Sequence, residues 1–241
     1  METIIQVQEL TKNYGQLLAV DHVSLSVQAG KVFGLLGANG AGKSTTIECI
    51  LGTRKADSGK VSILSLDPQK DRRRLFQQVG VQFQESDYQP EIKVSELCEE
   101  TACLYHSPAD WKKLCTQFGL ANKINSAVKS LSGGERQRLF IVLALIPNPQ
   151  VVFLDELTTG LDTKARRDVW KILEGLKNQG MTIFLTSHFM DEVEALCDEI
   201  CILKKGCIVF YGTVEQAKKE SGCEKFEDAY LMLAGEGVDA E

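Results

Sequence analysis

The chain has 241 residues, of which 44% are hydrophobic, and it carries a formal net charge of −6. It is long and apolar enough to bury a core, while its acidic balance argues against a broad nucleic-acid surface, which needs clustered Lys and Arg. The longest apolar run, residues 139–146, is far shorter than the roughly 18 residues of a membrane span, and the N-terminus does not read as a secretory signal, so we expect a cytoplasmic protein.

Short β-rich runs alternate with helical patterns along most of the chain. The expected strands lie at residues 23–27, 31–37, 60–64, 79–83, 151–156, 181–187 and 199–206. Several are apolar at almost every position, which is typical of strands buried on both faces. This order predicts an α/β core with a mostly parallel sheet covered by helices.

The middle of the chain breaks this alternation. Apolar residues at helical spacing predict a helix over residues 94–105, and a second helix is expected to begin at Ser107 and Pro108 and to stop at Gly119. We therefore predict a helical subdomain over residues 89–150, inserted into an α/β core of residues 1–88 and 151–220. Residues 221–241 form the expected C-terminal helix and tail.

Eight cysteines are scattered through apolar segments without CxxC spacing. This pattern favours buried free thiols in a reducing compartment over a disulfide framework or a metal site. The only dense basic run, "DRRR" at residues 71–74, is interpreted as a solvated helix face. Neither feature indicates a nucleic-acid partner.

The segment "GANGAGKST", residues 37–45, fits the pattern GxxxxGK[ST] between an apolar strand and a helix. Such a glycine-rich loop curls around a triphosphate, with its N–H groups and the helix N-terminus directed at the anion. Lys43 is expected to reach the outer phosphates and Ser44 to ligate Mg²⁺. The expected nucleotide contacts of this loop are Gly37, Asn39, Gly40, Gly42, Lys43, Ser44 and Thr45.

Two carboxylates end the apolar strand "VVFLDE", at the sheet edge where ligands of open α/β sheets bind. Asp155 is expected to support Mg²⁺, and Glu156 to orient and polarise the water that attacks the γ-phosphorus. His188 follows another buried strand and is predicted to contact phosphate, whereas His22 and His106 are expected at the surface. Gln84 follows a strand as well, and its amide is a candidate contact to Mg²⁺ or to the water.

The segment "LSGGERQR", residues 131–138, has a serine and two glycines before a run of eight apolar residues, as at a helix N-terminus. Its N–H groups are suited to bind an anion, yet the phosphate loop lies some 90 residues upstream in the chain. The sequence thus contains two separate segments suited to phosphate.

These motifs, in this order, resemble the ATP-binding subunit of an ABC transporter over nearly the whole chain. The resemblance implies a P-loop NTPase (RecA-like) core with the inserted helical subdomain and an N-terminal antiparallel β region. Carried over, Tyr14 is similar to the aromatic that stacks on adenine, with a simple loop aromatic as the alternative. Gln84 resembles the Q-loop glutamine, Asp162 the D-loop aspartate and His188 the switch histidine.

The resemblance also implies that two subunits pack head to tail, so that Ser132, Gly133 and Gly134 contact the γ-phosphate held by the partner's phosphate loop. The family usually has proline after the catalytic glutamate, and this chain has Leu157 instead. Because proline there would only fix φ, Glu156 is kept as the predicted catalytic residue.

The function that follows is an ATP- and Mg²⁺-dependent ATPase subunit that docks on separate membrane-spanning subunits at the inner face of the membrane. The polar segment at residues 85–94 is the expected docking loop. The short C-terminal segment resembles that of drug and lipid exporters. The alternatives are a soluble ABC ATPase acting on nucleic acid or ribosomes, and a regulator that binds ATP without hydrolysis.

Overall fold

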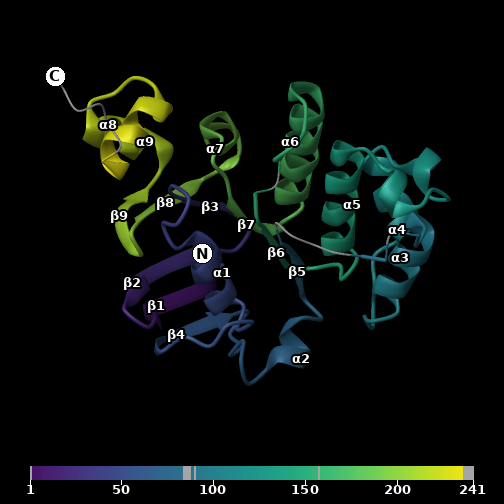
Figure 1. The fold of residues 1–241 in the computed structure, drawn as a ribbon, viewed down its shortest axis with the longest axis horizontal. Helices are drawn as coiled ribbons and strands as arrows, with labels where there is room; N and C mark the ends of the chain where they lie inside the picture. The colour runs from purple at the N-terminus through teal and green to yellow at the C-terminus, as the bar shows by residue number, and fades with distance from the viewer. Residues whose placement is uncertain (1, 84–87, 90, 157, 236–241) are drawn as a thin grey trace. The chain divides into compact units, whose positions relative to one another are not determined.

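The computed structural model describes residues 2–83, 88–89, 91–156 and 158–235 (Figure 1). Gln84, Leu157 and most of residues 85–90 therefore lie outside the described residues, as does the expected tail from 236 on. The chain divides into two compact units, Met1–Leu75 with Leu185–Glu241, and Phe76–Phe184. The predicted subdomain boundaries stay predictions.

The first unit contains an antiparallel sheet built from the N-terminal part of the chain. Its strands, β1 (Thr3–Tyr14), β2 (Leu17–Gln28) and β4 (Ser58–Ile63), lie in the order β2-β1-β4. β1 and β2 are joined by a turn at Gly15, whose φ of 60° suits glycine. This sheet confirms the expected N-terminal antiparallel region.

The same unit contains the strand that leads into the phosphate loop. β3 (Val32–Leu36) is buried at all five positions and pairs in parallel with β8 (Glu199–Lys204). β9 (Cys207–Gly212) returns antiparallel to β8, and α1 (Lys43–Ile50) follows the loop after β3. The short helix α2 (Arg72–Leu75) exposes its three arginines, so the solvated helix face is confirmed.

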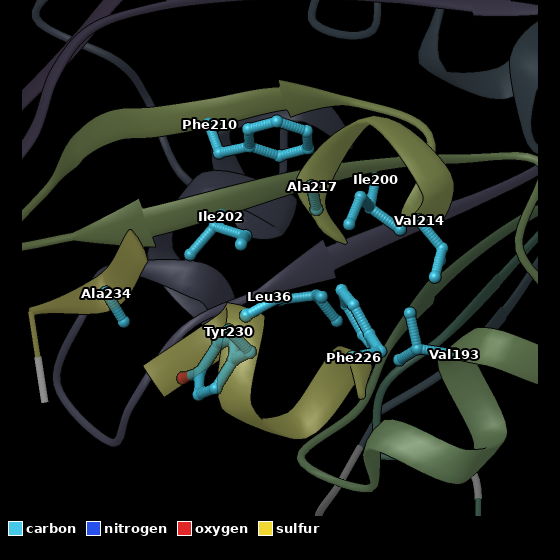
Figure 2. Packing of buried hydrophobic residues seen from close by; sticks show 11 residues of the cluster. Leu36, Val193, Ile200, Ile202, Phe210, Val214, Ala217, Phe226, Tyr230 and Ala234 are labelled. Carbon is cyan, nitrogen blue, oxygen red and sulfur yellow. The ribbon is translucent and has the colours of Figure 1, made fainter. Parts of the chain in front are cut away.

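Three helices of the C-terminal part cover one apolar cluster of the first unit: α7 (Met190–Leu196), α8 (Val214–Ser221) and α9 (Phe226–Ala234). In Figure 2, Phe226 and Tyr230 of α9 lie beside Leu36, the last residue of β3. Phe226 is 1% exposed and Leu36 is fully buried. The expected C-terminal helix is therefore part of the core that supports the strand entering the phosphate loop.

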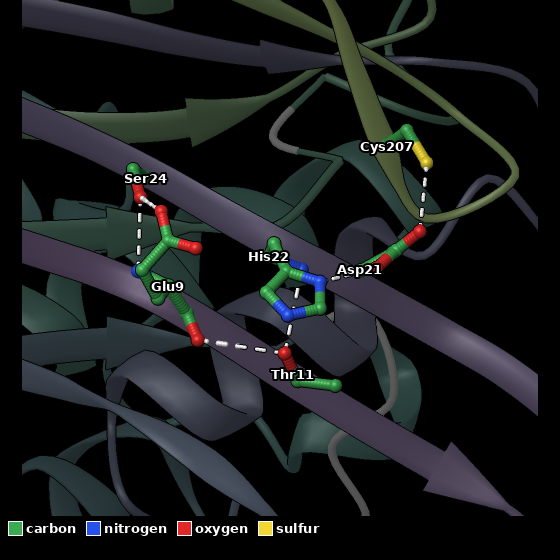
Figure 3. Close-up of polar contacts among 6 residues, drawn as sticks. All are labelled: Glu9, Thr11, Asp21, His22, Ser24 and Cys207. Atoms are coloured by element: carbon green, nitrogen blue, oxygen red, sulfur yellow. Dashed lines mark hydrogen bonds and ion pairs between the residues drawn. The ribbon is translucent and has the colours of Figure 1, made fainter.

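A polar cluster joins β2 to the β8–β9 hairpin (Figure 3). The Asp21 carboxylate lies 2.6 Å from His22 Nδ1 and accepts from the Cys207 thiol at 3.4 Å. The Asp21 N–H donates to the Gly206 carbonyl at 2.9 Å. His22 is exposed, as expected, and its φ of 47° lies in the left-handed region.

The Asp21–His22 pair should make stability depend on pH. The hydrogen bond to Asp21 raises the pKa of His22 above 6.5. The contribution of the protonated His22 to the free energy of unfolding is therefore complete below pH 6.5 and is lost as pH rises through the raised pKa. We expect His22→Asn, which tolerates the left-handed backbone, to lower the melting temperature at about pH 6 and to have little effect at about pH 9. Thermal denaturation across this range tests it, with His106→Asn as the control; an identical effect at both ends would contradict it.

The second unit contains the parallel pair β5 (Val79–Gln82) and β6 (Val151–Leu154). Between them in sequence lie α3 (Val94–Ala102), α4 (Trp111–Gln117), α5 (Gly133–Leu145) and the 3₁₀ turns η1 (Ala121–Lys123) and η2 (Val128–Ser130). α6 (Thr163–Asn178) follows β6, and β7 (Thr182–Thr186) contains the boundary between the units. The helical character expected for the middle of the chain is confirmed.

The predicted start of the second helix was wrong. α4 begins at Trp111, and its cap is Asp110, whose carboxylate accepts from the N–H groups of Lys112 and Lys113. The backbone before it is held elsewhere, because Ala109 N–H donates to the Ile146 carbonyl at 2.8 Å. The predicted end is correct: Gly119, with φ 69°, follows the helix.

Half of the cysteines follow the prediction of buried thiols. Cys49, Cys98, Cys115 and Cys201 are buried and free. Cys103 and Cys207 are exposed, and for these two the prediction of burial was wrong. None of the helices in the described ranges has the length and apolar character needed to cross a bilayer.

Candidate nucleotide site

The phosphate loop lies between β3 and α1 in the first unit. Lys43 is the first residue of α1 and is 7% exposed. Its ammonium donates to the carbonyls of Gly37 at 2.7 Å and Ala38 at 3.1 Å, so the loop curls around the lysine head group. A buried ammonium inside such a ring of backbone is suited to meet phosphate oxygens.

Two glycines of the loop are required by close approach as well as by backbone angle. At Gly42, with φ 103°, a Cβ would lie 2.3 Å from the Ala19 carbonyl oxygen. At Gly37 it would lie 2.5 Å from the Leu203 carbonyl oxygen. Any larger residue would displace the loop backbone, which explains why the pattern needs glycine at both positions.

The remaining loop residues are accessible to a ligand. Asn39, Gly40 and Ser44 are exposed, and Thr45 is half-buried. Gly40 has φ 81°, and a Cβ there would meet no atom within 4 Å, so it is chosen for backbone angle rather than for packing. The exposed side of the loop therefore offers backbone N–H groups and the Ser44 hydroxyl.

Tyr14 and His188 belong to the same unit as the phosphate loop. Tyr14 is the last residue of β1 and is 40% exposed. His188 follows β7, is exposed, and its ring centroid lies 4.1 Å from that of Phe189. Its neighbour Ser187 is buried and accepts from the Phe189 N–H at 3.0 Å, which fixes the turn after the strand.

The paired carboxylates lie at the end of β6 in the second unit. Asp155 is 6% exposed, and its N–H donates to the Gln82 carbonyl at 3.0 Å. Glu156 has φ 49°, a left-handed backbone that costs a non-glycine residue roughly 1–2 kcal/mol. The Thr159 hydroxyl lies 3.5 Å from its carboxylate. Other non-glycine residues, such as His22, share a left-handed φ, so the location of this half-buried acid directly after a fully buried strand marks the turn as a functional candidate.

Ser132 is the N-cap of α5, and its hydroxyl accepts from the Glu135 N–H at 3.2 Å. The Glu135 carboxylate accepts in turn from the Ser132 N–H at 2.9 Å, a capping box that lowers the pKa of Glu135, with Lys123 adding a smaller effect. Ser132 and Gly133 are exposed. The expected helix start is confirmed, and the box that fixes it was not foreseen.

Asp162 caps the next helix of the same unit. Its carboxylate accepts from the Ala165 N–H at 2.9 Å at the start of α6. A Cβ at Gly134 would lie 3.2 Å from the side chain of Leu161. Residues 131–138, named here the signature segment, are therefore neighbours of the residue before Asp162. The second unit thus holds Ser132, Gly133, Gly134 and Asp162 at helix N-termini, where anions bind.

The fold and these two sets of residues define a P-loop NTPase. The sequence matches the family described as "ABC transporter" over residues 20–159, more than half of the chain. The chain belongs to the ABC transporter family and is an ATP-binding ATPase subunit of that family.

Curated relatives include an ATP-binding protein named for export and one named for a multidrug transporter. The chain is 38% identical to the Nod factor export ATP-binding protein I of Ralstonia nicotianae, over 93% of this chain and 72% of the relative. It is 34% identical to the probable multidrug ABC transporter ATP-binding protein YbhF of Escherichia coli, over 96% of this chain and 42% of the relative.

Solved structures show the same architecture. One ATP-binding subunit of an ABC transporter superposes with a TM-score of 0.88 at 26% identity, covering 96% of this chain and 99% of that one. The ADP conformation of another ATP-binding cassette gives a TM-score of 0.83 at 27% identity, covering 99% of this chain and 100% of that one. The α/β P-loop fold expected from the sequence is thus confirmed.

Proposed function

We propose that the chain powers an export-type ABC transporter by ATP-driven pairing with a second ATPase subunit while docked on separate membrane-spanning subunits. The observation that carries the proposal is the loop around Lys43. The Lys43 ammonium donates to the carbonyls of Gly37 and Ala38 in this loop. The loop backbone leaves no room for a side chain at Gly37 or Gly42. Such a loop has one evident use, the binding of a phosphate chain.

The phosphate loop and the end of β6 both carry side chains that fit a bound Mg²⁺. Within the described ranges no three His, Cys, Asp or Glu side chains converge on a metal position. Mg²⁺ takes oxygen ligands and is usually held by one or two protein groups together with substrate phosphates and water, and a serine hydroxyl and an aspartate carboxylate are such groups. We assign the Ser44 hydroxyl and the Asp155 carboxylate to it, with the Gln84 amide as a third ligand. When bound, the ion would neutralise charge on the phosphates.

The catalytic assignment follows the chemistry of each side chain. Glu156 would orient and polarise the attacking water, and His188 would contact the γ-phosphate. Tyr14 would stack on adenine, which its exposed ring allows. Asp162 would act from the turn before α6, where its carboxylate already orders the helix start, and that turn would face the second subunit.

The signature segment is assigned to the partner's nucleotide. Ser132, Gly133 and Gly134 begin α5 and would present N–H groups to a γ-phosphate held by the second subunit. Two such surfaces, together with Lys43, would repel one another when empty. Bound ATP would supply the missing negative charge, and hydrolysis would release the pair.

The membrane partner is assigned to the segment around residues 85–94. Within it, Tyr88 is exposed and packs its ring 5.4 Å from Phe140 of α5, the helix that begins with the signature segment. A partner pressing on this loop would therefore act on the signature helix. The name of the Nod factor export relative favours export, and the location would be the cytoplasmic face of the membrane.

Affinity purification tests the membrane partner. The tagged chain, expressed in its source cells and solubilised in mild detergent, should retain a hydrophobic protein with several spanning helices. Tyr88→Asp should abolish that retention, whereas Leu104→Asp, at a residue 72% exposed in the same unit, should not. Retention of ribosomal proteins or nucleic acid instead would favour the soluble alternative.

A further inference from the structure

We propose that Arg54 is a positioning residue that holds the Tyr14 ring ready to stack on a purine base; this inference rests on the proposed nucleotide site. Tyr14 ends β1, and Arg54 lies just after α1. The Arg54 guanidinium carbon lies 5.3 Å from the centroid of the Tyr14 ring. A guanidinium at this distance is attracted by the ring's π-electrons and restricts its rotation.

Arg54 is itself fixed to the helix that carries the phosphate loop. Its Nε lies 2.5 Å from the Glu48 carboxylate, and its backbone N–H donates to the Glu48 carbonyl at 3.0 Å. The Thr53 hydroxyl donates to the same carbonyl at 3.0 Å. Since Glu48 belongs to α1, whose first residue is Lys43, Arg54 ties the expected base contact to the element that holds the phosphates.

A second cation near the ring, Lys12, also forms an ion pair at the end of β1. The Lys12 ammonium lies 5.7 Å from the Tyr14 centroid and 2.9 Å from the Asp57 carboxylate. That carboxylate also accepts from the Asn13 N–H at 2.6 Å, so Lys12 and Asp57 fix the backbone at the end of β1. The Asn13 N–H and then Lys12 lower the pKa of Asp57, because both interactions favour its charged form. Lys12 thus fixes the end of the strand in addition to lying near the ring, whereas Arg54 makes the shorter contact with the ring and makes it from the segment after α1.

This arrangement predicts whether Arg54 affects binding of the base or binding of the phosphates. A residue that acts through Tyr14 should affect binding of the base and leave binding of the phosphates unchanged. Because exposed cation–π contacts are weak, Arg54→Gln should weaken ATP binding only about two- to fivefold. Binding of inorganic tripolyphosphate, which has no base, should not change.

The experiment measures the dissociation constants of ATP and inorganic tripolyphosphate, both with Mg²⁺, by calorimetry. The proteins are the unmodified chain, Arg54→Gln, Tyr14→Ala and the double variant. Arg73→Gln, at an exposed arginine of α2, is the matched control for loss of one positive charge. The Arg54 side chain is 41% exposed, so the fold should persist, which melting curves check.

The expected result is a loss of ATP affinity in Arg54→Gln that disappears in the Tyr14→Ala background. An equal loss for tripolyphosphate, or the same loss with and without Tyr14, would overturn the inference, because Arg54 would then contact phosphate or nucleotide directly. An unchanged ATP affinity in Arg54→Gln would overturn it too. A failure of the unmodified chain to bind ATP would instead refute the proposed function from which the inference starts.

Discussion

Replacing Glu156 by Gln is expected to lower ATP turnover by about a hundredfold or more, which corresponds to about 3 kcal/mol of transition-state stabilisation. Glutamine keeps the shape of the side chain but cannot polarise the attacking water as a carboxylate does. ATP binding should remain, because the phosphate loop lies on other elements of the chain. Unhydrolysed ATP should then hold the paired subunits together.

Phosphate release, ATP binding and sizing chromatography with MgATP measure these three effects on one preparation. Glu174→Gln is the matched control, since Glu174 is an exposed glutamate on α6 of the same unit. A Glu156→Gln protein that hydrolyses ATP at the normal rate and stays monomeric would refute the assignment of Glu156. Its left-handed φ of 49° would then need another explanation.

Mixing Lys43→Ala with Ser132→Arg is expected to restore ATPase activity that neither variant has alone. Each homodimer of either variant has two damaged sites. In a mixed dimer one site carries both defects, whereas the other joins an unmodified phosphate loop to an unmodified signature segment. If the signature segment served the nucleotide of its own subunit, every site in the mixture would remain damaged.

The measurement is ATP hydrolysis after subunit exchange has been confirmed. Because Ser132 caps α5, Ser132→Arg also removes a cap worth about 1 kcal/mol, so Ser132→Ala, which removes the cap without adding a bulky charged side chain, controls for helix stability. Activity no higher than that of either parent would contradict a shared site. ATP hydrolysis by a covalently linked dimer with Lys43→Ala in one subunit tests whether both sites must be intact for activity.

Much of the fold and of the candidate site could be predicted from the sequence, because the signals were local. The runs that form β3, β6 and β7 are apolar at nearly every position, and the structure buries each strand completely. The glycine spacing around Lys43 predicted a phosphate loop. The structure explains these glycines by their left-handed φ angles and by the lack of space for a Cβ at Gly37 and Gly42. Backbone sterics and burial on both faces operate within a few residues, so the pattern alone records them.

Other features were decided only by the tertiary structure. α4 begins at Trp111 because a hydrogen bond from Ala109 to Ile146, distant in the chain, holds the preceding backbone and leaves the cap to Asp110. The helix from Val94 ends at Ala102, three residues before the predicted end at 105. The Gln77 side chain donates to the Leu104 carbonyl and accepts from the His106 N–H, and these bonds hold the backbone after the helix. The contact of Arg54 with Tyr14 joins two elements about 40 residues apart. Local propensity permits several endings and partners, and long-range hydrogen bonds and packing select one of them.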